Sequence, residues 1–341
     1  MNTAQTLKAF VKLGGHLDAE LQDTSSQLQK LIREAKQYNG WFTEENVATS
    51  VRAITPNLNT EKLTDWLSNY QIPSTKSPFK IGVIMAGNIP LVGFHDFMCV
   101  LFSENIFIGK TSSQDSHLLP YIADQLIKIE PAFKERIFFA DKLNDIDAVI
   151  ATGSDNSARY FDYYFGKYPH IIRKNRNSIA ILDGTETAEQ VELLGKDIFQ
   201  YFGLGCRNVS KIFIPEDYKV DSFFKPIESY SDIIHHHKYA NNYNYNRTIY
   251  LMNKNKFYDN GFLVLKGDAA LASPVGVLFF EYYNDLKSLE KKLAADKNKI
   301  QCIVGKIKSE QLNIIPFGKA QSPDLSDYAD EVDTMKFLLG L

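Results

Sequence analysis

The stretch "FKIGVIMAGNIPLVGFHDFMCVLFSENIFIGK" (79–110) changes its pattern twice over a short span. The apolar run at 79–85 predicts a buried strand, 91–103 has the apolar periodicity of a helix, and 105–109 predicts a second strand. Two strands joined through a helix run parallel, because the crossover returns the chain to the edge of the sheet where it began. The stretch therefore predicts the start of a parallel sheet covered by helices.

The same alternation continues beyond this stretch and restarts after a polar, basic segment, "RKNRNS" (173–178). We expect helices at 115–129, 155–165, 188–200 and 285–295, and strands at 147–152, 179–182, 211–215, 261–266, 275–283 and 300–305. Two series of this kind predict an α/β protein with two parallel-sheet units. A length of 341 residues agrees, because it is long for one simple core.

The two ends of the chain differ from this middle part. Helical periodicity with many polar positions occupies 3–70, and the prolines and serines of "IPSTKSP" (72–78) are typical of a linker. The last part of the chain is rich in loop residues before a short apolar end. We therefore divide the chain into segments 1–77, 78–178, 179–305 and 306–341.

The composition is that of an ordinary globular protein, with 44% hydrophobic residues, 23% charged residues and a formal net charge of −3. This balance argues against a chain that coats nucleic acid or an anionic membrane. Cys99, Cys206 and Cys302 lack disulfide or metal spacing, and the N-terminus lacks the apolar region of a signal peptide. These two features favour a cytoplasmic protein. Polar residues interrupt the apolar stretch 81–102, so we expect no membrane span.

Four short stretches combine turn residues with reactive or polar side chains at the ends of expected elements. They are "MAGNIPL" (85–91), "IGKTSS" (108–113), "ATGSDNS" (151–157) and "GLGCRN" (203–208). Gly153 permits a tight turn, and Ser154 or Asp155 can cap the next helix, whose N-terminus suits an anion such as phosphate. An ordinary capped helix explains the same residues. Lys110 suits a ribose or phosphate edge, although a surface lysine is the simpler interpretation.

Asn88 and Cys206 carry the features of a catalytic pair. Asn88 follows an expected strand, where open parallel sheets place their sites, and a neutral amide is a suitable oxyanion donor. It can also simply hold its own turn. Cys206 follows two glycines instead of lying in an apolar run, and Gly205 lets the backbone approach closely, so the Cys206 N–H can be a second oxyanion donor.

These stretches, in this order, resemble the aldehyde dehydrogenase superfamily, and more closely the acyl-CoA reductase family of the bacterial luminescence fatty acid reductase. The resemblance runs from about residue 78 to the C-terminus, and "AQSPDLSDYADEVDTMKFL" (320–338) is similar to that family's C-terminal signature. It implies an aldehyde-dehydrogenase-like α/β fold: two parallel-sheet lobes with the active site between them, preceded by a helical region. In these terms 78–178 is the cofactor lobe, 179–305 the catalytic lobe and 306–341 a tail able to supply an oligomerisation strand.

The resemblance also implies roles for single residues. Cys206 takes the place of the nucleophile and Asn88 that of the oxyanion amide. Lys110 takes the place of the lysine on the adenosine ribose, and Ser154, after Gly153, that of the serine on the cofactor pyrophosphate. Ser113 stands where many relatives bind the ribose 2′-hydroxyl with a glutamate, and a neutral serine there favours NADPH over NADH.

Two departures from the superfamily pattern bear on the reaction. Hydrolytic relatives carry a base glutamate where this chain has "IIRKNRNS" (171–178), which contains no acid. Water is then a poor acceptor of the acyl group, whereas coenzyme A can exchange through a thioester. Relatives also place a glutamate on the nicotinamide ribose, and this chain has "AALA" (269–272) there, so the nicotinamide end of the cofactor must be held differently. We expect reduction of a fatty acyl-CoA by NADPH through an acyl-enzyme.

The resemblance leaves a second interpretation open, and it implies partners. The alternative is a non-reducing subunit that carries an acyl group or binds a partner such as an acyl-protein synthetase. The likeness to oligomeric relatives implies a homo-oligomer.

The remaining candidates have simpler explanations beside them. Three adjacent histidines, 235–237, point in different directions on a helix and are poorly spaced for a metal. The segment "KYANNYNYNR" (238–247) can line an acyl or coenzyme channel, or be a polar packed loop. His95 can shape a pocket or be a packed helix residue, and Cys99 and Cys302 are expected in the core.

Overall fold

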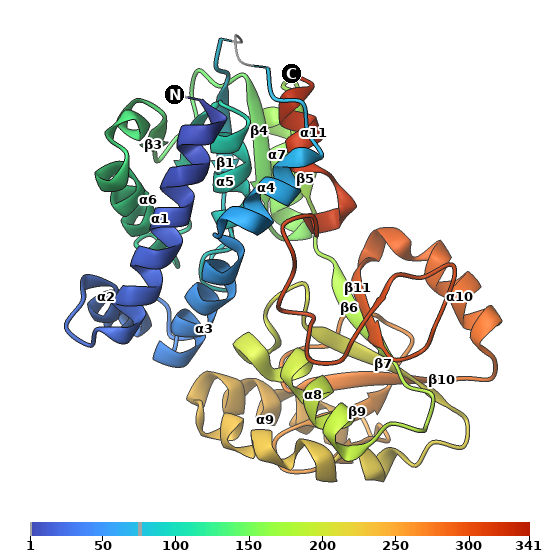
Figure 1. Cartoon of the computed structure of the whole chain (residues 1–341). Coiled ribbons are helices and arrows are strands. Elements are labelled where there is room, and N and C mark those ends of the chain that lie inside the picture. The colour runs from blue at the N-terminus through green and yellow to red at the C-terminus, as the bar shows by residue number, and fades with distance from the viewer. Residues whose placement is uncertain (1, 74–76) are drawn as a thin grey trace. The chain divides into compact units, whose positions relative to one another are not determined.

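The computed structural model describes residues 2–73 and 77–341, and it folds into two compact units (Figure 1). The first unit contains the chain up to Asn175 together with Asp324–Leu341, and the second contains Arg176–Pro323. Each unit has its own sheet. The α/β class with parallel sheets and N-terminal helices is therefore confirmed, whereas the functional names given to the segments remain predictions.

Four helices open the first unit, and each begins at a residue whose side chain accepts a hydrogen bond from a backbone N–H of the first turn. They are α1 (Thr3–Gln22), α2 (Gln27–Tyr38), α3 (Glu44–Ile54) and α4 (Thr60–Ser68). Their buried faces, which include Phe10 and Trp66, join one hydrophobic core with the helices of the first sheet. The helical region is therefore an integral part of this unit.

The first sheet has five parallel strands in the order β3-β2-β1-β4-β5. They are β1 (Lys80–Ile84), β2 (Ile106–Lys110), β3 (Ile137–Phe139), β4 (Ala148–Thr152) and β5 (His170–Arg173), connected through α5 (Phe94–Phe102), α6 (Leu118–Ile129) and α7 (Asp155–Phe165). The chain moves outward from β1 to β3 and then returns to β4 on the other side of β1. The order therefore reverses between β1 and β4, which is where such sheets bind ligands.

The second sheet has seven strands in the order β12-β11-β6-β7-β10-β9-β8, and its pairings are parallel except that between β8 and β9. The strands are β6 (Asn177–Ile181), β7 (Val209–Pro215), β8 (Tyr258–Asp259), β9 (Val264–Gly267), β10 (Val277–Tyr283), β11 (Ile300–Gly305) and β12 (Ile314–Ile315). The helices include α8 (Ala188–Phe199), α9 (His237–Met252) and α10 (Leu286–Ala295).

The polar segment 238–247 is part of α9, so the packed-loop interpretation was wrong. Tyr239, Tyr243 and Asn246 are buried at helical spacing, and this stripe explains why so polar a sequence forms a helix here.

The end of the chain returns to the first unit through buried polar contacts. Helix α11 (Thr334–Leu339) supplies the Thr334 hydroxyl, which accepts a hydrogen bond from Arg173 at 3.0 Å. Arg173 also forms a bidentate pair with Asp96, at 2.5 and 2.8 Å. All three residues are buried, so the charges of Arg173 and Asp96 compensate each other away from water.

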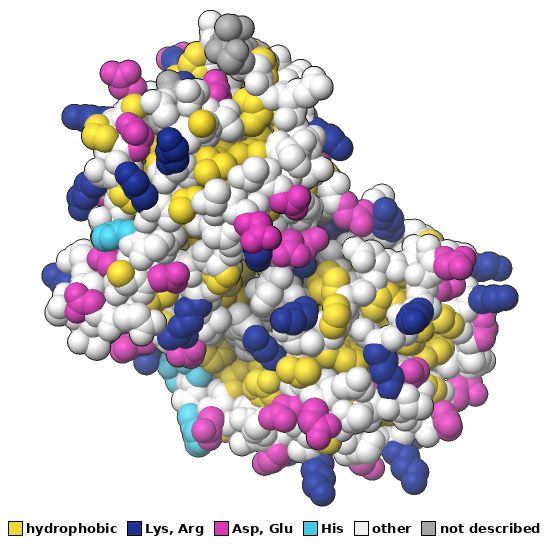
Figure 2. All heavy atoms as spheres, viewed as in Figure 1, with side chains coloured by type: hydrophobic (Ala, Val, Ile, Leu, Met, Phe, Trp, Pro, Cys, Tyr) yellow, Lys and Arg dark blue, Asp and Glu magenta, His cyan; other side chains and the backbone are white. Residues whose placement is uncertain are grey.

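On the face seen in the space-filling view, lysine and arginine side chains lie among aspartates and glutamates, as expected for 38 basic and 41 acidic residues (Figure 2). Within 2–73 and 77–341, none of the helices combines the length and apolar character needed to cross a membrane.

Candidate active site

The carboxyl edge of the first sheet collects three of the predicted site residues. Lys110 ends β2, Asn88 follows β1, and Ser154 follows β4. Because β1 pairs with both β2 and β4 in parallel, the three strand ends lie side by side. Ser113 is exposed in the loop after β2. The structure therefore brings Asn88, Lys110 and Ser154 to one edge, at the point where the strand order reverses.

The loop that carries Asn88 is fixed by residues from other elements. The Asn39 side chain donates to the Gly87 carbonyl at 3.0 Å, and the Ser50 hydroxyl donates to the Pro90 carbonyl at 2.8 Å. A Cβ on Gly87 would lie 2.6 Å from the Ser112 hydroxyl oxygen, so only glycine fits this close approach. The first-unit helices therefore help to position Asn88, a role that their amphipathic sequence does not reveal.

Asp115 holds the same loop from the side of β2. Leu91, whose φ is 61°, donates its N–H to Asp115 Oδ2 at 2.9 Å. Burial raises the pKa of Asp115 to about 6, although hydrogen bonds from the Leu91 and Leu118 N–H groups partly oppose the shift. The carboxylate thus links the loop that contains Asn88 to the loop that follows Lys110.

Ser154 is the N-cap of α7. Its hydroxyl accepts a hydrogen bond from the Ser157 N–H at 3.3 Å, in the geometry of an ordinary cap. A Cβ on Gly153 would lie 2.8 Å from the Ser157 Cβ, so glycine is required where β4 turns into the helix. This geometry is that of an ordinary capped helix. The N-terminus of the helix also lies at the carboxyl edge of the sheet, so anion binding there stays a prediction.

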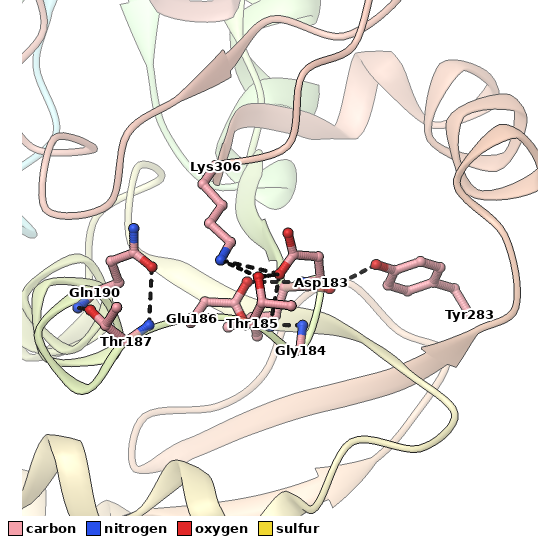
Figure 3. Close-up of polar contacts among 9 residues, drawn as sticks. Asp183, Gly184, Thr185, Glu186, Thr187, Gln190, Tyr283 and Lys306 are labelled. Carbon is pink, nitrogen blue, oxygen red and sulfur yellow. Dashed lines mark hydrogen bonds and ion pairs between the residues drawn. The ribbon is translucent and has the colours of Figure 1, made fainter.

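Cys206 belongs to the second unit, where α8 determines its location. The helix starts in the loop after β6 and returns the chain to the amino ends of β6 and β7, where Cys206 precedes β7. Figure 3 shows how the start of α8 is anchored. Thr187 and Gln190 form a capping box, the Glu186 carboxylate accepts two loop N–H groups, and Lys306 pairs with Asp183 at 3.3 Å.

Three consecutive residues before Cys206 have left-handed backbone conformations. The φ angles are 53° at Tyr201, 59° at Phe202 and 77° at Gly203. Only glycine adopts this conformation readily, and each of the other two residues costs roughly 1–2 kcal/mol. The turn therefore needs compensating contacts, and Tyr201 is buried while the Phe202 ring stacks on His236.

Asn208, which is 2% exposed, fixes the turn from its other end. Its side-chain nitrogen donates to the last carbonyls of α8 and to Gln200, at 3.1 Å to Asp197, 3.4 Å to Ile198 and 2.8 Å to Gln200. Its oxygen accepts the Gly205 N–H at 2.8 Å. Asn208 thus satisfies carbonyls that a helix end leaves open and closes the turn around Cys206.

Ser178 anchors the backbone of Cys206 to β6. Its buried hydroxyl donates to the Cys206 carbonyl at 2.9 Å and accepts the Cys302 N–H at 3.2 Å. The Arg207 side chain donates to the Ala320 carbonyl at 2.5 Å. Neither Ser178 nor Asn208 was identified from the sequence, because serine and asparagine occur in many turns and only the fold shows their partners.

The three thiols have different environments. Cys206 is exposed, Cys302 is half-buried in β11, and Cys99 is fully buried in α5, where burial raises the pKa of its thiol well above the usual value. The thiolate is the reactive form of cysteine, so Cys99 is a poor nucleophile and Cys206 the most accessible candidate. The core location expected for Cys99 is confirmed.

Two other histidines, His95 and His235, differ in their surroundings. His95 lies against Trp66 and Tyr328, and its Nε2 donates to the Leu325 carbonyl at 3.0 Å, so it is a packed helix residue. Burial lowers its pKa. His235 is exposed, 3.8 Å from Asp232. Across the described parts of the chain, no group of three histidine, cysteine, aspartate or glutamate side chains is arranged to hold a metal ion.

A model of the acyl-CoA reductase (LuxC) family matches residues 19–225, which is more than half of the chain. The chain belongs to the acyl-CoA reductase family. The match includes Asn88, Lys110, Ser154 and Cys206, and it confirms the resemblance and the assignment of an oxidoreductase enzyme. No curated protein matches the chain.

Solved structures of aldehyde dehydrogenases share the fold. Aldehyde dehydrogenase 21 from Physcomitrella patens, in complex with succinate, has a TM-score of 0.70 and 12% identity, and the match covers 100% of this chain and 84% of that one. An NADP-dependent enzyme from E. coli has a TM-score of 0.67 and 10% identity, with coverage of 93% and 78%. These likenesses confirm the aldehyde-dehydrogenase-like fold of this acyl-CoA reductase.

Proposed function

We propose that this member of the family reduces a fatty acyl-CoA to the aldehyde and coenzyme A, with NADPH as the reductant and Cys206 as the nucleophile. The observation that carries the proposal is the exposed Cys206 thiol on a strained turn that Asn208 and Ser178 hold in place. In a chain of this family, such a thiol is suited to form a covalent acyl intermediate.

The carboxyl edge of the first sheet fits a nicotinamide dinucleotide. Lys110 would contact the adenosine ribose, and Ser154 with the N-terminus of α7 would hold the pyrophosphate, while Gly153 keeps the turn compact. When bound, the cofactor supplies a hydride. Ser113 carries no charge and leaves room for a 2′-phosphate, which favours NADPH. A relative with this fold is described as NADP-dependent, and another from Bacillus cereus is described in complex with NAD+.

The residues of this chain would act in a simple order. The Cys206 thiolate attacks the thioester carbonyl, a new carbon–sulfur bond forms, and the bond to coenzyme A breaks as its thiolate leaves. Asn88 and the Cys206 N–H would stabilise the negative oxygen, because donors at this position are most effective when charge develops in the transition state. After hydride reaches the acyl carbon, cleavage of the carbon–sulfur bond releases the aldehyde and restores the Cys206 thiolate.

The segment between β5 and β6 supports thioester chemistry over hydrolysis. It contains Lys174, Asn175 and Arg176, and so provides no carboxylate to activate water. The acyl-enzyme should therefore last long enough to be reduced or returned to coenzyme A. We also propose a cytoplasmic homo-oligomer that can receive its acyl group through an acyl-protein synthetase.

Cysteine variants test the nucleophile. NADPH oxidation with a series of acyl-CoAs should fall at least 100-fold in Cys206→Ser, because a serine hydroxyl is far less ionised at neutral pH. Cys302→Ser is the matched control and should retain turnover. Circular dichroism checks that both variants fold. Activity of Cys206→Ser within tenfold of the parent would refute the assignment. A parent enzyme that becomes acylated but oxidises no NADPH would indicate a non-reducing acyl-carrying subunit.

A further inference from the structure

The imidazole of His236 lies on the strained turn that leads to Cys206. The centroids of the His236 and Phe202 rings are 4.2 Å apart, and their planes are inclined by 29°, which is a stacked arrangement. Phe202 has a φ of 59° and is separated from Cys206 by only three residues. Whatever holds the Phe202 ring therefore also restricts the backbone immediately before the thiol.

His236 is itself held in place by the start of α9. It is the N-cap of this helix, and its Nδ1 accepts the Tyr239 N–H at 3.4 Å, so Nε2 carries the ring proton in the neutral form. Tyr239 is buried, and its hydroxyl donates to the Phe262 carbonyl at 3.0 Å. The imidazole is thus attached to a helix end that is fixed in the core of the second unit.

We propose that His236 is a positioning residue for the acylation of Cys206, acting through its stack on Phe202. The stack favours the left-handed conformation of Phe202 and thereby the orientation in which the thiolate meets the thioester. This inference rests on the proposed function, since it assigns a role toward the nucleophile. It gives a specific task to one member of the triple-histidine segment, which needs no metal.

Two substitutions separate the two contacts of His236. His236→Asn keeps a good N-cap for α9 and removes the ring, whereas His236→Phe keeps an aromatic ring and removes the cap acceptor. If stacking positions the turn, His236→Asn should lower kcat at least tenfold with less than a threefold change in KM, and His236→Phe should restore kcat to within threefold. His235→Asn, at an exposed neighbour, is the matched control and should behave as the parent.

A second measurement distinguishes positioning from loss of structure. Alkylation of Cys206 by iodoacetamide, quantified by peptide mass spectrometry, has little orientational demand and should change less than threefold in His236→Asn. Acylation of Cys206 by the acyl-CoA should slow at least tenfold. The inference is overturned if His236→Asn reacts as the parent, if both variants lose kcat equally, or if alkylation and acylation slow together. A failed proposed function is recognised separately, by turnover in Cys206→Ser.

Discussion

Asn208→Ala tests the idea that one side chain both ends α8 and closes the turn around Cys206. The substitution removes the bond from the Gly205 N–H at 2.8 Å and the bonds to the carbonyls of Asp197, Ile198 and Gln200. The amide nitrogen has two protons for three acceptors, so about three full hydrogen bonds are lost. At roughly 1 kcal/mol each for such bonds, the local stability should fall by about 3 kcal/mol.

Hydrogen exchange followed by mass spectrometry measures this loss at the helix itself. A fall of about 3 kcal/mol corresponds to exchange on the order of 10² faster for amides in the last turn of α8, because each 1.4 kcal/mol is a factor of ten. Amides of α1 lie in the other unit and should be unchanged. Tryptophan fluorescence is unsuitable here, since Trp41 and Trp66 both belong to the first unit.

Two further variants test whether the hydrogen bonds of Asn208 account for the expected loss of about 3 kcal/mol. Asn208→Asp keeps an acceptor for Gly205 but replaces the donor with a negative charge beside the C-terminal carbonyls of α8, so it should be at least as destabilising as alanine. Asn253→Ala changes the exposed C-cap of α9, whose capping bonds come from the backbone, and should have little effect. The role assigned to Asn208 is refuted if Asn208→Ala lowers the local stability by less than about 1 kcal/mol. It is also refuted if Asn208→Asp is as stable as the parent.

Two other predictions concern charge. Burial raises the pKa of Asp197 to about 6 from 3.8, although the Gly318 and Ala320 N–H groups oppose the shift, so its contribution to stability is present below pH 3.8 and lost as the pH rises through 6. The free energy of unfolding of Asp197→Asn, measured in urea, should therefore rise relative to that of the parent by about 2–3 kcal/mol as the pH increases from 4 to 7. A difference between the two proteins that does not depend on pH would contradict this. Asn88→Ala should lower the acylation rate of Cys206 roughly 10²–10³-fold while acyl-CoA binding changes much less. Strongly weakened binding at a normal rate would show that Asn88 holds the substrate instead.

The regular elements with strong local patterns could be predicted from the sequence. The expected strand at 147–152 is observed as β4, and the expected helix at 155–165 is α7. Strand β5, His170–Arg173, was missed, because its four residues include two polar ones. Arg173 is buried with the help of Asp96 and Thr334, which are distant in the sequence. Such partners come from the tertiary structure, and a local pattern does not contain them.

The candidate site divides in the same way. Residues with a motif, such as Asn88 and Cys206, could be proposed from short stretches of sequence, and their roles stay predictions. The residues that hold them could not be proposed. Asn39 contacts Gly87 from 48 positions away, and Ser178 contacts Cys206 from 28 positions away, so only the folded chain shows these bonds.

The start of β6 also bears on the fate of the proposed acyl-enzyme. In this segment hydrolytic relatives are expected to have a base, whereas here Ser178 uses its hydroxyl to bind the Cys206 carbonyl and the Cys302 N–H. His95 is no substitute, because burial lowers its pKa and its Nε2 donates to the Leu325 carbonyl. Ser178 thus holds the backbone of the proposed nucleophile, Cys206, and is not a carboxylate that could activate water. Under the proposed mechanism, the acyl group on Cys206 is then attacked by hydride or by the thiol of coenzyme A. Attack by water needs a base, which these residues do not supply.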